Sequence, residues 1–132
     1  MTVGLLLVTH NGIGDELKRS AEAIMKQDLE QLAVVSIPAE LQPVELGKFA
    51  DRVKQNLIAQ DTGGGVLVLT DLYGATPNNL ARHFSNDVSA IVLSGVNLPM
   101  LLRVLNYSQQ LLQPLSETAL SGGKNGILQG QL

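Results

Sequence analysis

Short, nearly continuous apolar runs alternate along the chain with longer segments in which apolar residues recur every three or four positions. A short apolar run is typical of a strand that is buried on both faces, as in a parallel sheet. A spacing of three or four residues indicates a helix with one buried face. The runs predict strands over residues 3–8, 32–37, 66–70 and 88–93, and the spaced segments predict helices over residues 15–25, 43–60, 100–107 and 114–124, with a further helix that begins at Thr76.

Proline and glycine mark the boundaries between these elements. Pro38 ends the second strand, Pro43 suits the first turn of the helix that follows, and residues 63–65 (GGG) break the chain before the third strand. The alternation of strands and helices, with no repeat and no linker, predicts one α/β domain over residues 1–132. Its mainly parallel four-stranded sheet is expected to carry helices on both faces, and the tail from about Gly122 is expected to be loosely ordered.

Composition narrows the classes of function. Hydrophobic residues make up 45% of the 132 residues and charged residues 16%, the opposite of the balance that disordered chains show. The formal net charge of −3, with no long basic run, argues against nucleic acid as a partner. The chain has no cysteine and only two histidines, which excludes disulfides, thiolate catalysis and cysteine-type zinc sites. We therefore expect neither a bound metal nor a cofactor.

We expect no targeting signal in the first residues. No basic segment precedes the apolar run at residues 3–8, and that run is too short to span a bilayer. We expect a cytoplasmic protein that does not insert into the membrane.

Residues that could take part in catalysis or ligand binding follow three of the predicted strands. His10 follows the first strand, Asp71 the third, and Gly95 and Asn97 the fourth. The carboxyl ends of parallel strands meet at one edge of the sheet, where α/β proteins form their sites. An imidazole can act as a nucleophile when a carboxylate holds its Nδ1–H and leaves Nε2 free. Asp71 is the natural carboxylate partner for His10.

A phosphoryl group suits this edge as the electrophile. Two helices are predicted to begin here, one after His10 and one at Thr76, and helix N-termini favour anions. Gly12 and Gly74 allow the backbone to approach a ligand closely. The Thr76 hydroxyl can donate to a phosphoryl oxygen. We therefore take Thr76, Gly74, Asn11 and Gly12 as the candidate phosphoryl-binding residues.

Each candidate also has an ordinary structural explanation. A histidine after a strand can be a simple loop residue, Asp71 can belong to a turn, and Thr76 can serve as the N-cap of its helix. His83 lies in a predicted helix next to Phe84 and is expected to be a surface or packing residue. Residues 63–65 precede a strand and lack a following Lys-Ser/Thr pair, so they do not form a nucleotide-binding loop.

Three segments resemble the mannose-type EIIA family of the bacterial sugar phosphotransferase system, in the order and spacing of that family. They are residues 3–10 (VGLLLVTH), 65–79 (GVLVLTDLYGATPNN) and 95–101 (GVNLPML), and the middle one is the most specific. The resemblance implies a homodimeric protein-histidine phosphotransferase. Such a protein takes a phosphoryl group from phospho-HPr and passes it to an EIIB protein, for sugar uptake and phosphorylation.

The resemblance also implies roles for single residues. The histidine at the position of His10 carries the phosphoryl group, the acidic residue at the position of Asp71 orients it, and the hydroxyl residue at the position of Thr76 lies near the phosphoryl group. The chain departs from many relatives at Asn11, where they have glycine. The added side chain can alter the loop shape or the contact with a partner.

Two related functions stay open as alternatives. One is a regulatory phosphocarrier without a dedicated transporter. The other is a relative of the dihydroxyacetone-kinase phosphocarrier, which shares the fold and the histidine but usually reads closer to Met-Gly-Ser after the third strand.

Two unrelated classes are disfavoured. A receiver domain phosphorylated on aspartate needs acidic magnesium ligands after its first strand, where this chain has residues 9–11 (THN). It also needs a lysine where Ser94 and Gly95 stand. A plain interaction module would leave His10 and Asp71 without a shared purpose.

Overall fold

A four-stranded sheet with the order β2-β1-β3-β4 forms the centre of the molecule, and all of its strand pairs are parallel. The computed structural model describes residues 2–130. Its elements are β1 (Gly4–His10), α1 (Ile13–Met25), β2 (Leu32–Ile37), α2 (Pro43–Gln60), β3 (Val66–Thr70), α3 (Thr76–Phe84), β4 (Ala90–Ser94), α4 (Leu98–Asn106) and α5 (Leu112–Asn125). The predicted α/β fold with a parallel four-stranded sheet is confirmed.

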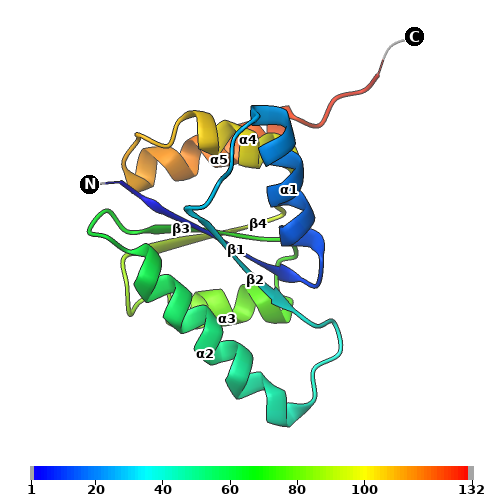
Figure 1. Cartoon of the computed structure of the whole chain (residues 1–132), viewed down its shortest axis with the longest axis vertical. Coiled ribbons are helices and arrows are strands. Elements are labelled where there is room, and N and C mark those ends of the chain that lie inside the picture. The colour runs from blue at the N-terminus through cyan, green and yellow to red at the C-terminus, as the bar shows by residue number, and fades with distance from the viewer. Residues whose placement is uncertain (1, 131–132) are drawn as a thin grey trace.

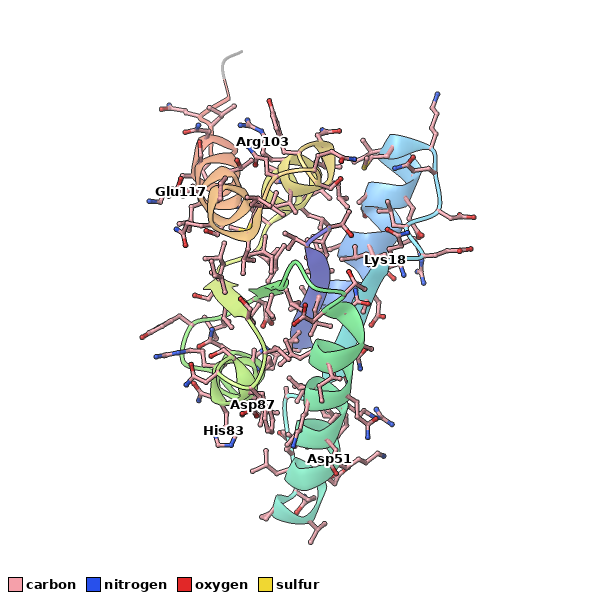
Figure 2. The ribbon with its side chains drawn as sticks, turned by 90° about the vertical axis from the view of Figure 1, so that its left-hand side faces the viewer. Lys18, Asp51, His83, Asp87, Arg103 and Glu117 are labelled. Atoms are coloured by element: carbon pink, nitrogen blue, oxygen red, sulfur yellow. The ribbon has the colours of Figure 1, made fainter. Side chains whose placement is uncertain are left out.

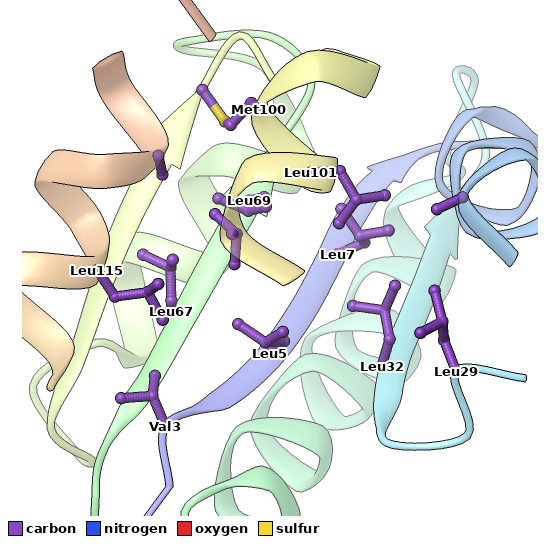
Figure 3. Packing of buried hydrophobic residues seen from close by; sticks show 13 residues of the cluster. Val3, Leu5, Leu7, Leu29, Leu32, Leu67, Leu69, Met100, Leu101 and Leu115 are labelled. Atoms are coloured by element: carbon purple, nitrogen blue, oxygen red, sulfur yellow. The ribbon is translucent and has the colours of Figure 1, made fainter. Parts of the chain in front are cut away.

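The helices form two layers, one on each face of the sheet. Helices α1, α4 and α5 cover one face, and α2 and α3 cover the other (Figure 1). Side chains alternate along β1, because successive residues of a strand point to opposite faces. Leu5 and Leu7 pack in the cluster under α1, α4 and α5 (Figure 3), whereas Leu6 and Val8 pack in the cluster against α2 and α3. The sheet is thus buried on both faces, which explains why its strands are apolar runs.

The predicted element boundaries hold best where they rest on a local signal. The bounds of β2, β3 and α2 agree with the predicted ranges, and Pro43 occupies the first turn of α2. Strand β1 continues to His10, two residues beyond its last apolar residue, because Thr9 and His10 still pair with Ser36 and Ile37 of β2. His10 is therefore the last residue of a central strand.

Several other boundaries differ by two residues from the prediction; α1 begins at Ile13 and not at residue 15, and α5 begins at Leu112 and not at residue 114. Strand β4 begins at Ala90 and not at residue 88. Helix α4 begins at Leu98 and not at residue 100, because the Asn97 side chain caps it by accepting a hydrogen bond from the N–H of Met100.

The expected loose tail from Gly122 is wrong as far as Asn125. Helix α5 runs to Asn125, and Gly122 and Gly123 are buried within it. A Cβ atom at Gly122 would lie 2.6 Å from the Cβ of Arg103 on α4. The two glycines therefore allow α5 to pack closely on α4, and residues 126–130 follow outside regular secondary structure.

In the strand order β2-β1-β3-β4, the connections that leave the two middle strands, β1 and β3, run in opposite directions across the sheet. From β1 the chain passes through α1 on one face to the outer strand β2. From β3 it passes through α3 on the opposite face to the outer strand β4 (Figure 1). In open α/β sheets, this switch point at the carboxyl ends of the strands is where ligands bind.

Candidate active site

His10 and Asp71 meet at the switch point, as the sequence predicts. His10 ends β1 and Asp71 follows the last residue of β3, and the two strands pair in the register Val8↔Thr70. The Nδ1 atom of His10 lies 2.7 Å from Oδ2 of Asp71. The same Oδ2 accepts a hydrogen bond of 3.1 Å from the backbone N–H of His10. Two residues that are 61 positions apart thus form a pair held by two contacts.

The pair fixes the chemical state of the imidazole. An ionised carboxylate only accepts hydrogen bonds, so in the neutral ring Nδ1 carries the proton and Nε2 carries the lone pair. The side chain of His10 is 26% exposed, and that of Asp71 is 10% exposed. The ring can therefore be reached from solvent while the carboxylate that holds it is shielded.

The second carboxylate oxygen of Asp71 has no hydrogen-bond partner among residues 2–130, although it is buried. A buried polar atom without a partner costs free energy and calls for a functional explanation. Among the residues that the structure describes, the hydrogen bonds that Asp71 accepts all come from His10, through Oδ2. Its negative charge is therefore directed at the imidazole, where it stabilises any positive charge that develops on the ring.

The loops that follow β1, β3 and β4 at this edge each contain one glycine in the left-handed conformation. The φ angles are 84° for Gly12 after β1, 82° for Gly74 after β3 and 86° for Gly95 after β4. A Cβ atom at any of the three would have no neighbour within 4 Å. The glycines are thus required by the backbone angle and not by crowding. They let the chain turn sharply from strand to helix.

Thr76 is the first residue of α3 and is half-buried. The prediction that it is the N-cap is wrong: Ala75 occupies that position with extended backbone angles, and no side chain caps the helix. Pro77 follows within the first turn, where its ring favours helical angles without a cap. Thr76 therefore brings its hydroxyl to the helix N-terminus without the ordinary capping role.

Asn11 and Gly12 form the connection from His10 into α1. The backbone N–H of Asn11 donates a hydrogen bond to the carbonyl of Ile37 in β2. Asn11 and Gly12 are both exposed. Gly12 occupies the N-cap position of α1. The structure thus places all six predicted site residues at one edge of the sheet, and their contact with a phosphoryl group stays a prediction.

Three buried polar residues behind this edge are not among the predicted site residues. In the described part of the chain, the buried polar side chains are Thr9, Thr70, Asn78 and Ser116. The first three lie next to the reacting pair or in the first turn of α3. The signal in the sequence is a threonine at the end of an otherwise apolar run, directly before His10 and directly before Asp71.

Residues 2–130 contain no group of three or more His, Cys, Asp or Glu side chains that could hold a metal ion. Over the same residues, no helix is both long enough and apolar enough to cross a membrane.

The site residues fall within a match to a known family. The model of the mannose-type EIIA family, described as "PTS system fructose IIA component", matches residues 4–119. The chain belongs to this family. It is therefore an EIIA component of the mannose/fructose class of the sugar phosphotransferase system, as the resemblance implied.

Curated relatives agree with this family. The chain is 29% identical over 106 residues to the mannose-specific EIIAB component of Escherichia coli K12, a match that covers 80% of this chain and 32% of the relative. It thus spans about a third of the length of that relative. The fructose-specific EIIA component of Bacillus subtilis is 28% identical over 110 residues, which cover 83% of this chain and 73% of the relative.

Solved structures share the fold over nearly the whole chain. The mannose/sorbose specific IIA subunit from Enterococcus faecalis superposes with a TM-score of 0.80 at 25% identity, covering 100% of this chain and 97% of the other. The phosphotransferase system component EIIA from Streptococcus agalactiae has a TM-score of 0.80 at 23% identity and covers 96% of both chains. At that identity the second likeness concerns the fold alone.

Proposed function

We propose that this EIIA chain is a phosphoryl carrier that accepts a phosphoryl group from phospho-HPr on Nε2 of His10 and passes it to an EIIB protein. The observation that supports this most directly is the 2.7 Å contact between Nδ1 of His10 and Oδ2 of Asp71. It holds the ring in the tautomer whose free lone pair is on Nε2, which is the state that a nucleophilic imidazole needs.

The transfer needs no net movement of a proton on this chain. The Nε2 lone pair of His10 attacks the phosphorus atom, the bond between phosphorus and the donor atom breaks, and its electron pair stays with the donor. The Nδ1 proton remains in its hydrogen bond to Asp71, so the phosphorylated ring carries a positive charge. The shielded carboxylate stabilises that charge. Passing the phosphoryl group to the acceptor reverses these steps with a new nucleophile.

The phosphoryl oxygens would be held by the loops on either side of His10. Helices α1 and α3 both begin at this edge, and a helix N-terminus offers backbone N–H groups and a positive dipole end to an anion. Gly12 and Gly74 keep the backbone open to close approach. Thr76 would donate its hydroxyl and Asn11 its side-chain amide. No metal ion takes part in this proposal.

The wider pathway is proposed from the family. The relatives named above are described as mannose-, fructose- and mannose/sorbose-specific components, so we propose that the phosphoryl group ends on a sugar taken up through a membrane partner. We further propose that the chain works in the cytoplasm as a homodimer.

Intact-mass analysis after incubation with phosphoenolpyruvate, the first enzyme of the system and HPr tests the carrier role. We expect one added phosphoryl group, labile in acid, on the wild-type chain and none on His10→Ala. The matched control is His83→Ala, because His83 is the other histidine of the chain and projects from α3 at the surface (Figure 2). This control should accept the phosphoryl group like the wild type.

Two results would contradict the proposal. The first is a phosphoryl group on His10→Ala, which would put the site elsewhere. The second is an unmodified wild-type chain beside HPr that is itself phosphorylated, which would exclude HPr as the donor. The acceptor is tested by mixing the phosphorylated chain with an EIIB protein and following the label from one to the other.

A further inference from the structure

Two threonine hydroxyls stand directly behind the reacting pair. Thr9 precedes His10 at the end of β1, and Thr70 precedes Asp71 at the end of β3. Both threonines have a relative exposure of 0%. Their side chains reach opposite faces of the sheet, since Thr9 contacts α1 and Thr70 contacts α3. Each threonine therefore links the end of its strand to the helix that follows it.

The Thr9 hydroxyl uses both of its hydrogen-bonding functions. It accepts a bond of 2.8 Å from the N–H of Gly14 in α1, and it donates a bond of 2.9 Å to the carbonyl of His10. A Cβ atom at Gly14 would lie 2.9 Å from this hydroxyl, so glycine allows the close approach. The carbonyl of His10 is thus fixed to the first turn of α1, while its N–H is fixed to Asp71.

The Thr70 hydroxyl is used in the same way on the other face. It donates a bond of 3.0 Å to the carbonyl of Leu93 in β4 and accepts a bond of 3.1 Å from Nδ2 of Asn78 in α3. The carbonyl of Thr70 accepts a further bond of 3.0 Å from the N–H of Val96. The residue before Asp71 is thus held to β4, to the loop after β4 and to α3.

Asn78 and Asn79 extend this link to the loop that carries Asp71. The carbonyl oxygen of the Asn78 side chain accepts a bond of 3.2 Å from the N–H of Gly74, and Nδ2 of Asn79 donates a bond of 3.0 Å to the carbonyl of Gly74. Asn78 is 2% exposed, whereas Asn79 is exposed. Two consecutive side chains of α3 therefore form hydrogen bonds to Gly74, one from the protein interior and one from the surface.

We propose that Thr9, and Thr70 together with Asn78 and Asn79, are positioning residues that set the His10 imidazole and the Asp71 carboxylate in register for phosphoryl transfer. The inference rests on the proposed function, in that it assigns these residues to the same site. Thr9, Thr70 and Asn78 are buried, so this proposal gives none of them a direct contact with the phosphoryl group. They act through the backbone of His10 and through the loop that carries Asp71.

These residues matter because the hydrogen bond that they support, between Nδ1 of His10 and Oδ2 of Asp71, is short, at 2.7 Å. A hydrogen bond weakens steeply when its atoms move apart or its angle bends, so a small shift of either loop weakens the hold on Nδ1–H. A free imidazole prefers to carry its proton on Nε2, which removes the nucleophilic lone pair from that atom. Loss of either threonine hydroxyl should therefore raise the population of the unreactive tautomer.

The experiment compares valine and serine at both positions. Valine has the shape of threonine without the hydroxyl, whereas serine keeps the hydroxyl. Nitrogen-15 NMR of the neutral His10 ring reports which nitrogen carries the proton. We expect Thr9→Val and Thr70→Val to shift the ring toward the Nε2–H tautomer, and Thr9→Ser and Thr70→Ser to restore the wild-type signal.

The matched control is Ser116→Ala. Ser116 is 3% exposed, and its hydroxyl donates to the carbonyl of Gln113 within α5, a helix that carries no site residue. This substitution also removes a buried hydroxyl, so it reports the general effect of lost stability. We expect no change in the tautomer of His10.

Single-turnover kinetics supply a second readout. At saturating phosphorylated donor, we expect each valine variant to transfer about 10- to 100-fold more slowly, since small misplacements of reacting groups have effects of this size. The donor concentration at half-saturation should stay unchanged. An unchanged tautomer and rate in both valine variants, or an equal change in Ser116→Ala, would overturn the proposal.

Asn79→Ala keeps the test decisive should a valine variant not fold. It removes only the exposed hold on Gly74 and leaves the core intact. A shift toward the Nε2–H tautomer supports the positioning role of the loop contacts, and a wild-type spectrum contradicts it. Because the NMR readout needs no donor, it tests positioning even if the wild-type chain fails to accept a phosphoryl group, a failure that would count against the proposed function alone.

Discussion

Oδ2 of Asp71 accepts a hydrogen bond from the ring of His10 at 2.7 Å and another from the backbone N–H of the same residue at 3.1 Å. The two contacts fix both the tautomer of the imidazole and the distance between β1 and the loop after β3. An asparagine oxygen could accept the same two bonds, because it has the same place in the side chain. What asparagine lacks is the negative charge.

Asp71→Asn should therefore separate charge from geometry. We expect the variant to fold and to bind its donor like the wild type, but to transfer the phosphoryl group at least about 100-fold more slowly, since loss of the orienting carboxylate has an effect of this order or larger in other histidine sites. Single-turnover phosphorylation measures the rate. Asp87→Asn is the control, because Asp87 is exposed beyond the end of α3 (Figure 2). Equal rates for the wild type and Asp71→Asn would rule out the role of the charge.

Thr76→Ala should reduce transfer without reducing stability. Because Ala75 and not Thr76 is the N-cap of α3, the hydroxyl is not needed to cap the start of the helix. A hydrogen bond to a charged phosphoryl oxygen contributes about 1.5–3 kcal/mol, which corresponds to a rate loss of about 10- to 100-fold. Thr76→Ser should keep the wild-type rate. If the alanine and serine variants transfer at the same rate, the hydroxyl does not contact the phosphoryl group.

Gly74→Ala and Gly47→Ala should change stability in opposite directions. A Cβ atom at either glycine has no neighbour within 4 Å, so crowding plays no part. Gly74 has a φ of 82°, and alanine in that conformation costs about 1–2 kcal/mol. Gly47 lies inside helix α2, where alanine stabilises by about 0.5–1 kcal/mol. Urea unfolding measures both, and a stabilising Gly74→Ala would refute the account of the turn.

Gly122→Ala should destabilise the packing of α5 on α4. Its Cβ would lie 2.6 Å from the Cβ of Arg103, so the helices must move apart. Overpacking of this kind costs about 1–3 kcal/mol in the free energy of unfolding. The neighbouring Ser121 is exposed, so Ser121→Ala should change the free energy of unfolding by no more than about 0.5 kcal/mol. A neutral Gly122→Ala would mean that α5 does not need its close approach to α4.

Much of the fold follows from local patterns. The buried runs at β2 and β3 and the stripe of α2 are visible in the sequence because each residue's burial depends on the period of its own element. Two predictions were wrong because they depend on neighbours and not on a local period. They are the capping role of Thr76 and the loose tail from Gly122. At Thr76 the first turn of α3 forms around Pro77, and at Gly122 a glycine is an interface residue because Arg103 lies against it.

The candidate site also has features that can be predicted from the sequence and features that depend on the packing of distant segments. The pattern of residues is enough to predict that His10 and Asp71 follow buried strands and meet at one edge of the sheet, because the end of an apolar run can be read from the sequence and parallel strands end at a common edge. Three further features are visible only in the folded chain: β1 and β3 are neighbours, one carboxylate oxygen holds the ring, and Thr9, Thr70 and Asn78 lie buried behind the pair. Such contacts depend on which distant segments pack together, and a local pattern of residues contains no record of those distances.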